Sequence, residues 1–152
     1  MKRVHQFRRV LILLIAFVSL SITDAAEKVS YHTVHVQIGN IRNTKGRIQL
    51  QVFKDQKGYE EKDPWKANFI DKKNMKNKSL FYTIKGLETG VYGIAILDDE
   101  NKNTKMDYGW MLPEEGFGFA DYYHTGLTKP HFDDFKFHLN SDKTVKIIVR
   151  YL

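Results

Sequence analysis

Apolar and polar side chains alternate at every second position in several segments of this chain, and that alternation constrains the fold more than any other feature. A period of two is typical of a strand with one buried and one solvated face. Turn residues separate the segments, so the pattern indicates an all-β protein, an antiparallel β-sandwich of about seven strands with immunoglobulin-like or prealbumin-like topology. The alternating segments are 34–38, 48–52, 80–84, 92–96 and 145–151.

Glycine and asparagine mark the connections between these segments. GNIRNTKG (39–46) predicts a hairpin, and KGLETG (85–90) predicts a second turn in which Gly90 takes a positive φ. Residues 100–127 have no lasting periodicity but are rich in glycine and aromatic side chains, which argues against disorder. Long irregular stretches of this kind in compact domains are usually functional.

The N-terminal residues have the layout of a secretory signal peptide. MKRVHQFRR is basic, VLILLIAFVSLSI is apolar, and the small residues of Thr23-Asp24-Ala25 follow. We expect a signal peptide at 1–25 and a single mature domain at 26–152, located in the periplasm or secreted; an uncleaved anchor is the alternative. The apolar run is shorter than the roughly 20 residues of a membrane-spanning helix, so no stable membrane insertion is expected after cleavage.

Composition excludes several classes of function. The chain has no cysteine, which rules out thiol catalysis and zinc-thiolate sites. Without the leader the formal net charge falls to +3, and the Lys and Arg residues are scattered rather than clustered. We therefore expect no nucleic-acid partner. We also expect a monomeric protein. The serines stand in no Gly-x-Ser-x-Gly motif, and we assign no catalytic residue.

Oxygen-bearing side chains recur at alternate positions in DDENKNTKMDYGW (98–110), directly after an apolar strand. In calcium loops, oxygen ligands occupy positions 1, 3 and 5, a backbone carbonyl serves at 7, and a further ligand or water at 9. Thr104 stands at position 6, where glycine would ease the turn, and an Asx-rich turn without an ion is the alternative. The candidate Ca²⁺ ligands are Asp99, Asn101, Asn103, the carbonyl of Lys105 and Asp107, with Glu115, or Glu114, returning to the loop.

Aromatic residues surround glycines in EEGFGFADYY (114–123). Glycine lets a backbone approach a ligand or a neighbouring strand closely. The rings would then stack on a sugar or peptide, or Phe117 and Phe119 would instead close one end of the sandwich. The candidate ligand-binding residues are Trp110, Phe117, Phe119, Tyr122 and Tyr123.

Several of these motifs, in the same order, resemble the bacterial family named domain of unknown function 2141. The resemblance covers roughly residues 34–152 and departs from the family pattern at Thr104 for a loop glycine, Ala120 for serine and Phe135 for alanine. It implies an exported β-sandwich domain and no established activity. The matching residues are Gly90, Tyr92, Asp99, Asn101, Asn103, Asp107, Pro113, Glu115, Gly116, Phe117, Gly118, Phe119, Pro130, Phe132 and Phe137.

The sequence as a whole favours an exported, non-catalytic binding or structural module of the bacterial cell envelope, with Ca²⁺ organising the loop at 98–107 and a glycan or envelope protein as partner. The alternative is an envelope carbohydrate hydrolase that uses acidic residues of the 98–121 region, since two carboxylates about 5–10 Å apart suffice for glycoside cleavage. A hydrolase requires a concave pocket in which carboxylates converge. A binding module is expected to present a shallow aromatic patch.

Overall fold

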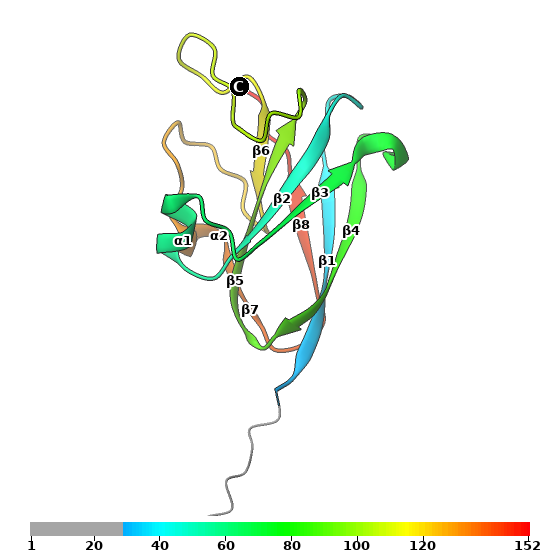
Figure 1. Cartoon of the computed structure of the whole chain (residues 1–152), viewed down its shortest axis with the longest axis vertical. Helices are drawn as coiled ribbons and strands as arrows, with labels where there is room; N and C mark the ends of the chain where they lie inside the picture. Colours follow the sequence, from blue (N-terminus) through cyan, green and yellow to red (C-terminus); the bar gives the residue numbers. More distant parts are fainter. Residues whose placement is uncertain (1–28) are drawn as a thin grey trace, which may run out of the picture.

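The computed structural model describes residues 29–152, which form two packed β-sheets (Figure 1). The predicted signal peptide at 1–25 lies outside the described residues. The strands are β1 (Tyr31–Gly39), β2 (Arg47–Phe53), β3 (Lys66–Asp71), β4 (Leu80–Glu88), β5 (Gly90–Asp99), β6 (Gly116–Phe119), β7 (Lys136–Leu139) and β8 (Lys143–Ile148). The short helices are α1 (Gln56–Glu61), η1 (Lys72–Asn74) and α2 (Phe132–Phe135).

The two sheets confirm the predicted all-β sandwich. Sheet A has the order β4-β1-β8, and sheet B has the order β3-β2-β5-β6, with β7 also paired to β5. The pairing of β1 with β8 is parallel, whereas the other strand pairs are antiparallel. The first and last strands of the domain therefore lie side by side in sheet A.

The predicted hairpin at 39–46 is wrong. β1 belongs to sheet A and β2 to sheet B, so the segment between them crosses from one sheet to the other. Turn residues identify a change of direction but not whether the next strand joins the same sheet. Gly90 also differs from the expectation, because it begins β5, and positive φ occurs instead at Gly46 (70°) and Gly86 (71°).

The core between the sheets consists of the residues that the alternation placed on one face of each strand. A fully buried aliphatic side chain contributes about 1.5–3 kcal/mol relative to exposure, so this layer dominates the stability of the domain. The buried strand residues of the core include Val34, Val36 and Ile38 of β1, Ile48, Leu50 and Val52 of β2, Leu80 and Ile84 of β4, Tyr92, Ile94 and Ile96 of β5, and Val145 and Ile147 of β8.

Two glycines of β6 let the sheets approach one another at one side of the sandwich. A Cβ atom on Gly116 would lie 2.4 Å from the Tyr151 ring, and one on Gly118 would lie 2.6 Å from Ile147. Between them, Phe117 and Arg150 exchange backbone hydrogen bonds of 3.0 and 2.8 Å. The Gly-Phe-Gly pattern therefore serves a close approach between β6 and the residues that follow β8.

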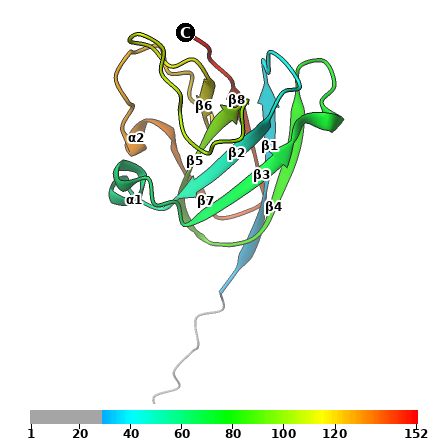
Figure 2. The same ribbon diagram turned by 45° about the horizontal axis from the view of Figure 1, so that its top comes forward.

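Helices α1 and α2 cover part of the outer face of sheet B (Figures 1 and 2). This part of the sheet is therefore buried on both faces, by the helices on one and by the core on the other. The backbone N–H of Phe132 donates to Oε1 of Gln56 at 2.6 Å, which ties the two helices together. A second cluster lies under them: Phe53, Tyr59, Ala95, Phe119, Phe132 and Phe135. No helix within residues 29–152 is long and apolar enough to cross a membrane.

Candidate functional site

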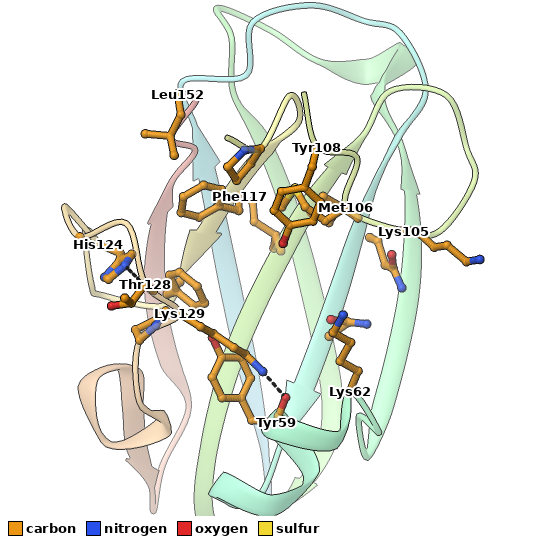
Figure 3. Close-up of a pocket in the computed structure, with 18 of the residues that line it drawn as sticks. Tyr59, Lys62, Lys105, Met106, Tyr108, Phe117, His124, Thr128, Lys129 and Leu152 are labelled. Carbon is orange, nitrogen blue, oxygen red and sulfur yellow. Dashed lines mark hydrogen bonds between the residues drawn. The ribbon is translucent and has the colours of Figure 1, made fainter. Parts of the chain in front are cut away.

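The outer face of sheet B holds a concave groove of about 870 Å³ beside the helix-covered region (Figure 3). Its floor follows from the strand register, because side chains directly opposite each other on neighbouring strands form rows across a sheet. Two such rows lie under the groove, Gln49–Leu97–Phe117 and Gln51–Ala95–Phe119.

Two loops form the side walls of the groove, and α1 with the residues after it closes the lower end in Figure 3. One wall is the loop 104–113, from which Met106 and Tyr108 lie close to Phe117 in the figure. The other wall is the loop 124–130. Arg150 fixes that second loop, since its Nη1 donates to the carbonyl oxygens of His124 at 2.9 Å and Gly126 at 2.7 Å.

The groove carries positive side chains and no negative ones. Lys62, Lys105 and Lys129 line it, and within the described part of the chain its lining includes no Asp or Glu. The other lining side chains are mainly aromatic, aliphatic, methionine, proline or uncharged polar groups. The site thus has the concave shape that the hydrolase alternative requires, but its described lining does not include the acidic side chains that this alternative places there.

Lys129 stands at the α1 end of the groove. Its Nζ donates to the backbone carbonyl of Tyr59 at 2.6 Å and lies 3.7 Å from the centroid of the Tyr59 ring. Burial lowers the pKa of Lys129, and the charge of Lys62 lowers it further, while Glu60 has a smaller, opposite effect. In residues 29–152, neither Lys62 nor Lys129 forms an ion pair with a carboxylate.

The predicted cation loop surrounds Asp99, the last residue of β5. Asp99 lies two residues beyond Leu97 and therefore faces the same side of sheet B as the groove floor. Its side chain is fully buried, and its Oδ2 accepts hydrogen bonds from Nε of Arg47 at 3.0 Å and from the backbone of Thr104 at 3.2 Å. Its Oδ1 is buried without a hydrogen-bond partner. Because an unpaired buried carboxylate oxygen is costly, this atom fits the role of a cation ligand.

The loop also brings Asn101 and Asn103 to Asp107. The Asn101 amide donates to the Asp107 carboxylate at 2.6 Å, and the Asn103 amide donates to both of its oxygens at 2.9 Å. No three His, Cys, Asp or Glu side chains of residues 29–152 are placed to hold a metal ion by themselves. A cation at this loop therefore requires amide and carbonyl oxygens, including the carbonyl of Lys105, in addition to the carboxylates.

Glu115 is the acidic residue that returns to the loop. Its buried carboxylate accepts hydrogen bonds from the backbone N–H groups of Glu100 at 2.8 Å and Asp107 at 3.4 Å. Burial raises the pKa of Glu115 and the charges of Asp107 and Asp99 add to the increase, while the two backbone hydrogen bonds oppose it. The sequence analysis named Glu115, with Glu114 as the alternative, and the structure places Glu115 against the loop backbone.

Thr104 makes the sharp turn that glycine serves at this position of a calcium loop, with a φ of 68°. For a residue with a Cβ atom, this left-handed conformation costs about 1–2 kcal/mol. Thr104 is also β-branched, which makes the conformation rarer still. The departure from the family pattern at this position therefore adds strain but leaves the turn in place.

A buried ion pair anchors the start of the loop from the core side. Nζ of Lys72 pairs with Oδ1 of Asp98, and the Tyr151 hydroxyl donates to Oδ2 of Asp98 at 2.6 Å. The Lys72 and Asp98 side chains are both fully buried. Burial raises the pKa of Asp98, although both partners act to lower it. These two contacts join η1 and Tyr151 to β5 at Asp98, the residue that precedes Asp99.

The five predicted aromatic ligand contacts do not gather in one place. Phe117 and Phe119 line the groove, on the outer face of sheet B, and so do not close an end of the sandwich. Tyr122 packs beside Phe119, with ring centroids 6.4 Å apart. Trp110 is 98% exposed, Tyr123 is also exposed, and neither of them lines the groove.

Sequence reasoning named Phe117 and Phe119 of the groove floor but missed the rest of the floor and the two lysines at its lower end. The alternation of β2 placed Gln49 and Gln51 on a solvated face, and it is the loop 104–113 that turns this face into a groove. Lys62 and Lys129 are 67 positions apart, and nothing in their surroundings in the sequence distinguishes them from the other lysines.

Residues 36–147 match the model of a family described as an uncharacterised protein conserved in bacteria (DUF2141). No curated protein and no solved structure matches the chain significantly. The family match extends from β1 into β8 and includes the loop at 98–107 and most of the groove. The chain belongs to the DUF2141 family of uncharacterised bacterial proteins, in agreement with its motifs.

Proposed function

We propose that the protein is an exported, non-catalytic binding module of the bacterial cell envelope and that the groove on sheet B is its binding surface. The observation that supports this proposal is a groove of about 870 Å³, more apolar than polar, whose lining in the described residues includes no Asp or Glu. Small-molecule sites typically measure about 300–1,000 Å³ and combine apolar walls with a few polar groups. Glycoside cleavage needs a pair of Asp or Glu side chains beside the reacting bond, and the described lining of the groove includes neither residue type.

The proposal includes a calcium ion in the loop at 98–107. Oδ1 of Asp99 is the buried oxygen that such an ion would satisfy. The amides of Asn101 and Asn103 would turn their oxygens toward the ion, and hard cations such as Ca²⁺ prefer oxygen ligands of this kind. The full ligand set proposed is Asp99, Asn101, Asn103, the carbonyl of Lys105, Asp107 and Glu115.

Calcium in this position acts on the groove through the backbone. Three residues of the loop at 98–107 also line the groove: Thr104, Lys105 and Met106. An ion that stiffens the loop therefore fixes one wall of the binding surface. Its role in this proposal is to order the protein and not to take part in a reaction.

Thermal unfolding of the purified protein tests the calcium site. With a Kd of about 10⁻⁴–10⁻³ M, as in extracellular calcium modules, about 10 mM CaCl₂ would stabilise the fold by about 1.4–2.7 kcal/mol relative to EDTA. Asp99→Asn and Asp107→Asn should abolish the increase in melting temperature. Glu61→Gln, at the exposed C-terminal end of α1, is the matched control and should retain it. Superimposable melting curves in calcium and EDTA would rule the ion out.

Export and the lack of catalysis have separate tests. Fractionation of the bacterial cells should place the protein in the periplasm or the medium, and N-terminal sequencing should find Ala26 as the first residue. Incubation with cell-wall polysaccharide should release no reducing ends. Retention in the cytoplasm, or release of reducing ends by wild-type protein and not by Glu115→Gln, would contradict the proposed function.

A further inference from the structure

We infer that the groove binds a single-chain amphipathic anion, with a carboxylate or phosphate head group between Lys62 and Lys129 and an apolar chain along the floor. The inference rests on the proposed function, which makes the groove a binding surface, and it adds the chemical class of the ligand.

The two lysines that would hold the head group converge on the α1 end of the groove from opposite sides (Figure 3). Lys62 is the C-cap of α1 and has a left-handed backbone with a φ of 57°. Lys129 belongs to the loop 124–130 and is held against the Tyr59 ring. The side chains are thus positioned by two different elements, and the lysines direct positive charge to the same end of the cavity.

The two lysines at this end of the groove form no ion pair within residues 29–152. Burial and the charge of Lys62 both disfavour the protonated form of Lys129, and neither lysine has a carboxylate partner in the described part of the chain. The charge of Glu60 raises the pKa of Lys129, but Glu60 does not line the groove. Its Oε1 accepts a hydrogen bond from the side-chain amide of Gln56 at 2.7 Å. An anion placed between the lysines would remove their repulsion and form charge-assisted hydrogen bonds.

The rest of the groove suits an apolar chain. Figure 3 shows Phe117, Met106 and Tyr108 toward the end of the groove opposite Lys62 and Lys129. Each methylene group buried there contributes about 0.8 kcal/mol. Methionine side chains adapt to ligands of irregular shape, and Met106 and Met111 both belong to the lining.

Charge complementarity separates this ligand class from others. A cationic amphiphile would meet Lys62, Lys105 and Lys129, and the described lining holds no Asp or Glu side chain to bind it. A neutral sugar would stack on the aromatic rings but would leave the two lysines at the α1 end without a charged partner. A short anion such as acetate would use the lysines but none of the apolar floor.

Isothermal titration calorimetry with dodecanoate below its micellar concentration tests the inference on the purified protein. We expect saturable one-to-one binding. Dodecyltrimethylammonium reverses the head-group charge, dodecyl maltoside removes the charge, and acetate removes the apolar chain. Each of the three should bind at least about tenfold more weakly than dodecanoate, a difference of about 1.4 kcal/mol or more. Equal affinity for dodecyl maltoside and dodecanoate would overturn the inference.

Two further ligands distinguish the source of the anion. Dodecyl phosphate carries the phosphate head group on a single chain and should bind as dodecanoate does. Vesicles of phosphatidylglycerol present the same charge on a two-chain lipid within a membrane. Binding to the vesicles without binding to either single-chain anion would overturn the inference in favour of a membrane surface.

Substitutions locate the head group. Lys62→Met and Lys129→Met remove the charge and retain an unbranched side chain, and each should weaken dodecanoate binding at least about tenfold without weakening dodecyl maltoside. Lys85→Met, on the exposed face of β4, is the matched control and should bind like the wild type. Melting temperatures show whether each variant is folded. If Lys129→Met unfolds because it loses the contact to Tyr59, Lys62→Met alone decides the test. Unchanged dodecanoate affinity in Lys62→Met would overturn the inference.

The same titration separates this inference from the proposed function. Chitotriose and trialanine represent the glycan and peptide ligands of a binding module. Suppose that one of them binds the wild type, that a substitution in the groove weakens this binding, and that dodecanoate does not bind. The ligand class is then wrong and the binding module stands. If none of the ligands binds to the folded protein, both the ligand class and the groove as a binding surface are contradicted.

Discussion

Replacing Lys72 with methionine would leave the Asp98 carboxylate buried, with only the Tyr151 hydroxyl as a hydrogen-bonding side chain. Methionine has nearly the length of lysine, so the change removes the charge with little loss of packing. Both members of the pair are fully buried, and the neighbouring Lys73 is 87% exposed in its pair with Asp71. Lys73→Met is therefore a matched control one residue away.

Loss of one partner of a buried ion pair typically costs about 3–5 kcal/mol, whereas exposed pairs contribute about 0–1 kcal/mol. We expect Lys72→Met to lower the free energy of unfolding by the larger amount and Lys73→Met by less than about 0.5 kcal/mol. A second change, Asp98→Asn, removes the buried charge but keeps an acceptor for Tyr151. In the double variant Lys72→Met/Asp98→Asn, we expect recovery of more than half of the lost stability.

The cost depends on pH in a direction that the structure fixes. Burial already raises the pKa of Asp98, and removal of Lys72 raises that pKa further because the attraction to the ammonium group is lost. A folded-state pKa above the unfolded value of about 3.9 means that stability falls as the pH rises from about 4 through the folded-state value. Lys72→Met should therefore be less destabilised, relative to the wild type, at about pH 5 than at about pH 8.

Urea denaturation at these two pH values measures both effects. Tryptophan fluorescence serves as the probe, because the ring of Trp65 lies 5.9 Å from the buried Tyr92 ring. A loss below about 1 kcal/mol in Lys72→Met, the range of surface pairs, would refute the argument. So would an equal loss at both pH values.

Three further predictions concern the loop and the closed side of the sandwich. Thr104→Gly removes about 1–2 kcal/mol of backbone strain, partly offset by about 0.5–1 kcal/mol of added unfolded-state entropy; the free energy of unfolding in EDTA, measured by urea denaturation, should therefore rise, and a fall would contradict the strain at this turn. Gly118→Ala places a Cβ atom 2.6 Å from Ile147 and should destabilise the fold by about 1–3 kcal/mol in urea denaturation. Gly39→Ala, whose Cβ atom would lie 3.4 Å from Ile148, is the control, and equal losses in both would argue against the close approach of β6. Because burial raises the pKa of Glu115, its ionised form opposes folding, so in EDTA the wild type should lose more stability than Glu115→Gln between about pH 4 and pH 7; identical pH profiles in thermal melts would refute this.

The parts of the fold that follow from local pattern were predictable from the sequence. The alternation in segments such as 34–38 and 48–52 identified the buried face of each strand correctly, because side-chain direction in a strand depends only on parity. Strand partners depend on contacts between distant residues, and turn chemistry did not reveal that 39–46 crosses between the sheets. The parallel pairing of β1 with β8 had no local signal for the same reason.

The candidate site divides in the same way. The spacing of Asn101, Asn103 and Asp107 lies within one loop, and the structure brings these three side chains together. Asp99 instead binds Arg47 and the backbone of Thr104, so a calcium site at this loop stays a prediction. The groove depends on which strands are neighbours and on loops that return over them. Lys72 is an example of a residue whose position could not be predicted. A lysine in the stretch DKKNMKNK is expected on a solvated surface, and only the structure shows that it is buried in a pair with Asp98.

The most direct test of the groove as the functional surface is an NMR titration of protein labelled with ¹³C in its methionine methyl groups. Met106 and Met111 line the groove, while Met75 packs against the core between the sheets and serves as an internal control. On addition of dodecanoate, we predict saturable shifts of the Met106 and Met111 signals and an unchanged Met75 signal. Saturable binding that shifts Met75 and leaves Met106 and Met111 unchanged would contradict the account, because the ligand would then occupy another part of the molecule.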